Sequence, residues 1–124
     1  TLDRSSAASD VYKRQALDGV TALSGSGPAY VFLFLEALVA GGLKVGLTET
    51  QAKQLALGTL AGATKLAAES TEPLAVLRER VTSKGGTTAA ALAAFGDAGF
   101  AGIVQDAMAA AARRSRELAE EFGK

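Results

Sequence analysis

Apolar positions recur along most of this chain at steps of three and four residues, the spacing of one buried helix face. The pattern runs through residues 52–67 and again through residues 100–111, and charged residues follow the second segment. Thr48 and Gln51 match a capping box directly before the first segment, with Thr48 as the N-cap. Runs of β-branched residues are few, and the chain has only two prolines. The pattern predicts an all-α fold, a multi-helix bundle of about five short helices.

Residues 28–40 differ in kind because they are apolar nearly all round, with Glu36 as the only charge. Ser26 or Gly27 can cap this segment, a proline fits its first turn, and Gly41-Gly42 is expected to end the helix. A helix of this sort in a soluble protein must be covered on every side. Two interpretations stay open: a central core helix of this chain, or a helix that a second subunit covers.

Residues 82–88, Thr-Ser-Lys-Gly-Gly-Thr-Thr, join two predicted helices at residues 74–81 and 89–95. The two glycines fall at the corner, and Thr87 and Thr88 fall on the first turn of the second helix. A helix start has unpaired N–H groups and a partial positive charge, and glycines before it let an anion approach. The pattern favours capture of a small carboxylate or phosphate. The alternative is a plain corner in which Thr87 or Thr88 caps the helix.

Composition narrows the classes of function. A chain of 124 residues, 48% of them hydrophobic, is long enough for one domain with a core. It has no Cys and no His, so a disulfide framework, a thiolate nucleophile and a metal site are not expected. A net charge of zero argues against a nucleic-acid partner. The longest apolar run is far shorter than the roughly 20 residues of a membrane span, and residues 1–15 lack the apolar region of a signal peptide. We therefore expect a soluble, cytoplasmic protein with no membrane partner.

Residues 1–15 are polar and lack a helical period, so we expect a poorly ordered tail, linker or junction, followed by a helical domain at residues 16–124.

Residues 24–27, Ser-Gly-Ser-Gly, look like a fragment of a dinucleotide-binding glycine loop. However, Tyr30 occupies the place of the third glycine, and no strand is evident before them. We expect a turn leading into the next helix, with the lining of a site as an additional role.

Motifs in several separated places point to one family. They occur in order at residues 17–30, 36–38, 41–47, 81–88, 99–100 and 114–118. Together they closely resemble the C-terminal domain of pyrroline-5-carboxylate reductases, over roughly residues 16–123. The resemblance implies an all-helical dimerisation domain that interlocks with a second copy, as a homodimer or a higher oligomer. It also implies the NAD(P)H-dependent reduction of 1-pyrroline-5-carboxylate to L-proline, the last step of proline synthesis.

The resemblance also assigns roles at the glycine corner. It implies that Thr88 is the catalytic hydroxyl, which hydrogen-bonds the ring nitrogen of the substrate. Backbone N–H groups around Gly85, Gly86, Thr87 and Thr88 would hold the substrate carboxylate, with Ser83 as a second contact. A threonine would relay a proton or orient the substrate rather than act as a strong acid.

The sequence departs from the family in two respects. The family's N-terminal Rossmann domain, which binds NADP or NAD, is absent from this sequence, so we expect no bound cofactor and no turnover by this fragment alone. Lys84 stands where proline is the more usual residue, which adds a cation beside the proposed anion site. Two alternatives remain: a purely structural dimerisation module, or the helical domain of another Rossmann-type dehydrogenase.

Overall fold

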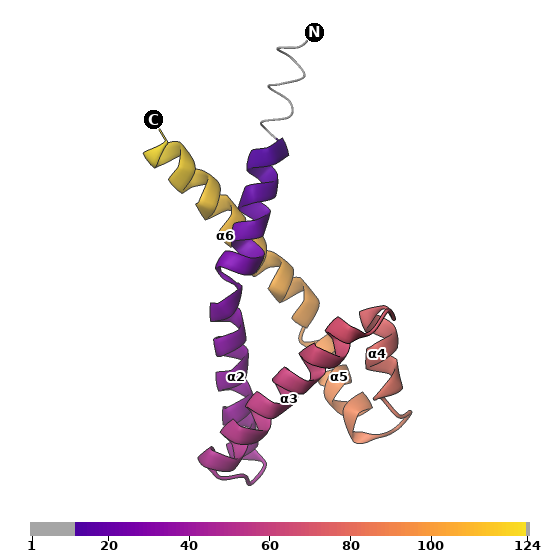
Figure 1. Cartoon of the computed structure of the whole chain (residues 1–124). Coiled ribbons are helices and arrows are strands. Elements are labelled where there is room, and N and C mark those ends of the chain that lie inside the picture. Colours follow the sequence, from indigo (N-terminus) through magenta and orange to yellow (C-terminus); the bar gives the residue numbers. More distant parts are fainter. Residues whose placement is uncertain (1–11, 124) are drawn as a thin grey trace. The chain divides into compact units, whose positions relative to one another are not determined.

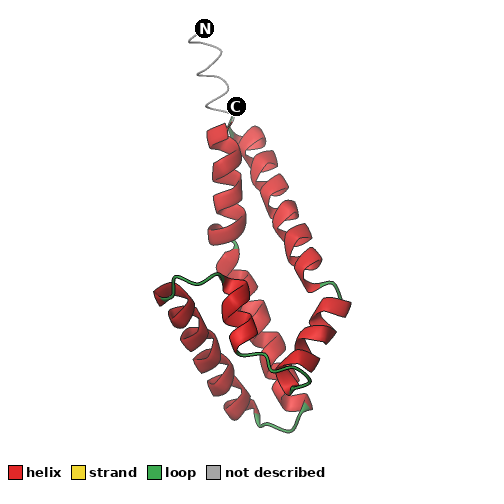
Figure 2. Cartoon of the chain, turned by 90° about the vertical axis from the view of Figure 1, so that its right-hand side faces the viewer, coloured by secondary structure: helices red, strands yellow, loops and turns green. Residues whose placement is uncertain are grey.

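The computed structural model describes residues 12–123. All regular structure within them is helical and they contain no strand, which confirms the predicted all-α fold (Figure 2). Residues 12–20 are helical and lead into a short π-helix, η1 (Thr21–Gly25). The α-helices that follow are α2 (Gly27–Lys44), α3 (Glu49–Glu69), α4 (Leu74–Arg80), α5 (Thr87–Asp97) and α6 (Phe100–Phe122). The chain divides into two compact units, one made of Thr1–Tyr30 with Phe100–Lys124 and the other of Val31–Gly99.

The first unit pairs the N-terminal helical stretch with α6, and the two helices cross in Figure 1. The Ser115 hydroxyl on α6 donates a hydrogen bond of 2.8 Å to the Asp18 carboxylate, and both side chains are partly buried. Residues 12–15 are already helical, so helix is present before the expected domain start near Ala16. Residues 1–11 of the expected tail lie outside the described residues.

The glycine-rich residues 24–27 lie within a nearly continuous helical stretch. The Ser26 N–H donates to the Thr21 carbonyl at 2.8 Å, a bond five residues back that gives a π turn. The Tyr30 hydroxyl donates to the Ala22 carbonyl at 2.6 Å, across the point where the helix changes its winding. The predicted new helix does begin at Gly27, but a π-helix, and not a turn, leads into it. The carbonyl groups at this break are satisfied by the π bond and by a tyrosine, so the helix resumes at Gly27 at once.

In the second unit, α2 packs against α3 at Gly42. A Cβ atom at Gly42 would lie 2.7 Å from the Cβ of Ala52, which is 3% exposed. The glycine is therefore required for the close approach of the two helices. The prediction that Gly41-Gly42 ends the helix was wrong, because α2 continues through both glycines to Lys44.

The actual end of α2 is a Schellman motif. The Leu47 N–H donates to the Gly42 carbonyl at 2.9 Å, and the Gly46 N–H donates to the Leu43 carbonyl at 3.1 Å. Gly46 has a φ of +104°, the conformation that this motif assigns to glycine. The chain then enters α3 through the predicted capping box, where the Thr48 hydroxyl accepts from the Gln51 N–H and the Gln51 side chain accepts from the Thr48 N–H.

Burial within this single chain is slight. The buried hydrophobic residues among those described are three alanines: Ala22, Ala52 and Ala56. The predicted face of α3 is buried only at its start, since Leu55 and Leu66 remain 57% and 59% exposed. On α2 the side chains of Val31, Phe32, Leu33 and Leu43 are likewise exposed, whereas Phe34, Leu35, Leu38 and Val39 are partly buried. This pattern favours the second interpretation of the apolar helix, in which another subunit covers it.

By length and composition alone, the helical stretch Tyr12–Lys44 could cross a membrane. The pair α5 and α6 would also pass that test if its bend of 49° were counted within one span. The longest uninterrupted apolar run had indicated no such segment. A helix whose apolar surface is covered by another protein subunit meets the same criteria, because they measure only length and hydropathy.

Candidate functional site at the start of α5

The start of α5 lacks a cap from its own chain. Thr87 and Thr88 lie on its first turn as predicted, with Gly86 as an N-cap that has no side chain to offer. The first amide that donates back to this corner is that of Ala90, to the Gly86 carbonyl at 3.2 Å. Within residues 12–123, the amides of Thr87, Thr88 and Ala89 have no hydrogen-bond acceptor. Three donors and the positive end of the helix dipole are therefore available together.

A tight turn sets the approach to these donors. The Gly86 N–H donates to the Ser83 carbonyl at 3.0 Å, so this amide is engaged within the chain. Gly85 has a φ of +74°, which favours glycine there. A Cβ atom at Gly86 would lie 3.2 Å from the Ser83 carbonyl oxygen and 3.4 Å from the Ser83 Cβ. Ser83 therefore lies directly against Gly86, beside the start of the helix.

The side chains at this corner differ in exposure. Thr88 is partly buried, whereas Ser83, Lys84 and Thr87 are exposed. The Thr82 hydroxyl donates to the Arg78 carbonyl at 2.5 Å, which ties the corner to the end of α4. Thr88 is thus the partly shielded hydroxyl of the α5 first turn, beside the free amides.

The structure brings the predicted site residues to one corner of the second unit. Among them, the Gly86 N–H donates to the Ser83 carbonyl within the chain, so it is not one of the free donors of this corner. Sequence reasoning did not include Ala89, whose amide is the third free donor. The sequence could have indicated this donor, because the N–H of any residue at the third helical position lacks a partner within the helix. It was missed because sequence reasoning considered side chains, and alanine has no polar side chain.

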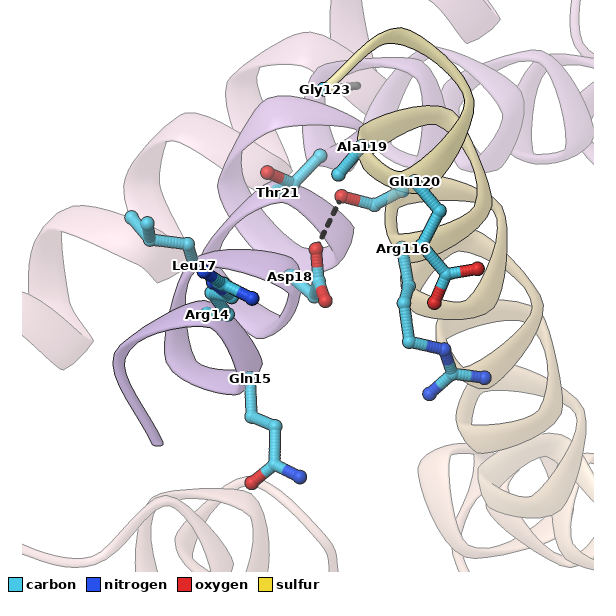
Figure 3. Close-up of a pocket in the computed structure, with 10 residues that line it drawn as sticks. Arg14, Gln15, Leu17, Asp18, Thr21, Arg116, Ala119, Glu120 and Gly123 are labelled. Carbon is cyan, nitrogen blue, oxygen red and sulfur yellow. Dashed lines mark hydrogen bonds between the residues drawn. The ribbon is translucent and has the colours of Figure 1, made fainter. Parts of the chain in front are cut away.

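A second concave region lies in the first unit, between the N-terminal helical stretch and α6 (Figure 3). It encloses about 670 Å³, and its charged lining alternates in sign: Arg14 and Asp18 on one helix, Arg116 and Glu120 on the other. None of the predicted site residues lines it. Within residues 12–123, no group of three or more Asp, Glu, His or Cys side chains is placed to hold a metal.

Comparison with known families agrees with the resemblance seen in the motifs. Residues 14–118 match the sequence model of the family described as pyrroline-5-carboxylate reductase dimerisation. The chain belongs to this family. The uncapped start of α5 lies well inside the matched residues, and the all-helical fold is that of a dimerisation domain.

Relatives and solved structures agree with the family. The chain is 48% identical over 108 residues to a pyrroline-5-carboxylate reductase of Pseudomonas aeruginosa, covering 87% of this chain and 40% of that protein. It is 46% identical to one of Synechocystis, covering 85% of this chain and 39% of the relative. A solved pyrroline-5-carboxylate reductase of Coxiella burnetii gives a TM-score of 0.81 at 38% identity, covering 84% of this chain and 38% of that one.

A solved pyrroline carboxylate reductase of Plasmodium falciparum with NADP bound gives a TM-score of 0.80 at 38% identity, covering 82% of this chain and 41% of that one. The chain thus spans about two fifths of the length of the relatives that it matches.

Proposed function

We propose that this chain is the C-terminal dimerisation and substrate-binding domain of an NAD(P)H-dependent reductase that converts 1-pyrroline-5-carboxylate to L-proline. Family membership and the names of the relatives support the reaction. The observation that carries the role of this domain is the uncapped start of α5, where three neighbouring amides lack an acceptor within the described residues.

The substrate carboxylate is proposed to bind at this helix start. Its oxygens would accept from the N–H groups of Thr87, Thr88 and Ala89, and the helix dipole would favour their negative charge. Gly86, which has no side chain, leaves this approach open. The hydroxyl of the exposed Ser83, whose Cβ lies beside Gly86, is proposed as a second contact. Lys84 adds a positive charge in the same turn.

The proposed chemistry needs a donor at the ring nitrogen, because a protonated imine accepts hydride far better than a neutral one. The Thr88 hydroxyl belongs to the same first turn as the carboxylate donors, so one short segment would hold both ends of the reacting group. A threonine at this place orients the nitrogen or relays a proton.

A nicotinamide cofactor, NADP or NAD, supplies the hydride when it is bound to the full-length enzyme. Residues 12–123 do not fit that cofactor by themselves. They contain no strand, and the dinucleotide-binding fold needs a strand leading into a glycine loop and a helix. The contribution of this chain is therefore to bind and orient the substrate.

The proposed partner is a second copy of the chain, in a homodimer or a higher oligomer. The large apolar side chains left exposed on α2 support this assembly. The same surface would then be covered by protein and not by lipid, in a soluble, cytoplasmic enzyme that binds no nucleic acid. Sedimentation should show no stable folded monomer at micromolar concentration, and finding one would contradict the assembly.

A nicotinamide oxidation assay with 1-pyrroline-5-carboxylate tests the reaction. The full-length enzyme should turn over, and the purified 124-residue chain alone should not. If the full-length enzyme reduces another cyclic imine or a keto acid instead, the chain is the helical domain of a different dehydrogenase. If the full-length enzyme reduces 1-pyrroline-5-carboxylate but L-proline does not bind at the start of α5 in competition with the substrate, this domain is a purely structural dimerisation module.

A further inference from the structure

The corner before α5 is a type II turn with Lys84 at its second position. The hydrogen bond of 3.0 Å from the Gly86 N–H to the Ser83 carbonyl closes this four-residue turn. Gly85, its third residue, has a φ of +74°, whereas no residue other than glycine has a positive φ within residues 12–123. A positive φ at the third position alone defines type II, and the second position of such a turn commonly holds proline. The backbone therefore does not require a lysine at this place.

Lys84 is an unpaired cation. Its side chain is exposed, and within the described part of the chain it takes part in no ion pair or hydrogen bond. Arg80 is the other charged residue between positions 80 and 96, and its guanidinium lies 3.2 Å from the Glu72 carboxylate. No acidic residue occurs from position 80 to position 96, so no neighbour in the sequence offsets the charge of Lys84.

This charge lies close to the three free amides at the start of α5. Lys84 is three residues before Thr87, so their Cα atoms would be at most about 11 Å apart in an extended chain. The turn shortens that distance. Because the Debye length is about 8 Å at physiological ionic strength, an ammonium group at this range attracts an anion at the helix start. Unlike the hydrogen bonds from the amides, this attraction weakens strongly as salt is added.

We propose that Lys84 is a specificity-determining residue of the substrate site. Its ammonium group attracts the substrate carboxylate to the start of α5 and takes no part in the reduction. The inference rests on the proposed function, because it needs a carboxylate at the three amides. It gives the site a preference for anionic over neutral cyclic imines in addition to the one that the amides provide. The expected effect is that of an exposed charge pair, about 2- to 5-fold in KM.

Steady-state kinetics of the full-length enzyme, with 1-pyrroline-5-carboxylate and saturating cofactor, tests this role. Lys84→Met removes the charge and keeps a long side chain, so KM should rise about 2- to 5-fold at low salt with kcat unchanged. The difference from the wild type should disappear near 1 M salt, where the Debye length is about 3 Å. Lys84→Arg should keep the KM of the wild type.

Lys44→Met is the matched control. It removes one exposed lysine from the end of α2, which lies away from the corner in Figure 1, and it should leave KM unchanged. Lys84→Pro separates the charge from the turn. Proline suits the second position of a type II turn and should raise the urea midpoint of unfolding, while KM rises as in Lys84→Met.

Three results would overturn the inference: a wild-type KM in Lys84→Met at low salt, an increase that persists at 1 M salt, or an increase in Lys84→Pro alone. The last would assign the effect to the turn and not to the charge. All three would leave the amide site and the reaction intact. A full-length enzyme that does not reduce 1-pyrroline-5-carboxylate would instead overturn the proposed function, and the role of Lys84 with it.

Discussion

Two helix starts in the second unit differ in how their amides are satisfied. At α3 the start is closed by its own side chains, because Thr48 and Gln51 exchange hydrogen bonds with each other's backbone. At α5 the corresponding place is held by Gly86, which offers no acceptor, and three amides remain without a partner within the described residues. A capped start contributes only to folding. An uncapped start beside glycines leaves the same donors to a ligand, which is why the site is proposed at α5.

The largest expected effect comes from Thr88→Ala in the full-length enzyme. Loss of the hydroxyl at the ring nitrogen should lower kcat about 10- to 1000-fold, the range for one positioned catalytic group. KM should change less, because the three amides stay in place. Steady-state kinetics measures both constants, and circular dichroism checks folding. Thr88→Ser is the matched control, which should recover much of the rate. If Thr88→Ala has the kcat and KM of the wild type, the hydroxyl has no role in the reaction, and residues 82–88 are a plain helix start.

Giving α5 an N-cap side chain should weaken binding of the substrate carboxylate. In Gly86→Asp the new carboxylate would accept from the first-turn amides and compete with the substrate. Loss of one or more hydrogen bonds to a charged group predicts a KM raised about 10- to 100-fold. Gly86→Ala is the control, since it adds the same Cβ beside Ser83 without an acceptor. An equal rise in KM in both variants would mean that crowding, and not capping, weakens binding.

Gly85→Ala should lower stability through the backbone. Gly85 has a φ of +74°, and a side chain in the left-handed region costs roughly 1–2 kcal/mol. Urea unfolding monitored by circular dichroism measures the change in the free energy of unfolding. Gly19→Ala is the comparison, because a Cβ there meets nothing within 4 Å and the residue is helical. A loss of stability in Gly19→Ala as large as in Gly85→Ala would argue against the conformational cause.

The smallest effect is expected at the capped helix. Thr48→Ala should reduce the free energy of unfolding by about 1 kcal/mol, the typical value of an N-cap, and leave kcat and KM unchanged. The same unfolding and kinetic assays apply. A clear change in KM would mean that the two helix starts do not divide between folding and binding as described.

Sequence patterns predicted the parts of this fold that depend on local chemistry. The Thr48 capping box, the first turn of α5 at Thr87 and Thr88, and a last helix with its apolar period from Phe100 are set by residues within one or two turns, and all three are confirmed. The roles of two glycine-rich segments were predicted wrongly because they depend on distant or less common contacts. Gly42 allows the close approach of Ala52 from α3, and residues 24–27 are held by a π turn and by the Tyr30 hydroxyl. Neither arrangement has a local signature.

The candidate site, too, combines features that the local sequence predicts with features that it does not. The position of the corner and of Thr88 followed from the motif, because glycines before a helix are a local signal. The sequence did not predict which amides are free, because this depends on the turn in which the Gly86 N–H donates to the Ser83 carbonyl. Burial could not be predicted from one chain either. Several large apolar residues of α2 remain exposed here, and the proposed second copy would bury them.

A crystal structure of the full-length enzyme with L-proline bound tests the central claim most directly. The account predicts that the carboxylate oxygens lie about 2.7–3.2 Å from the amide nitrogens of at least two of Thr87, Thr88 and Ala89, with the Thr88 hydroxyl within the same range of the ring nitrogen. A carboxylate held by other groups, or a protein side chain occupying the start of α5, would contradict it.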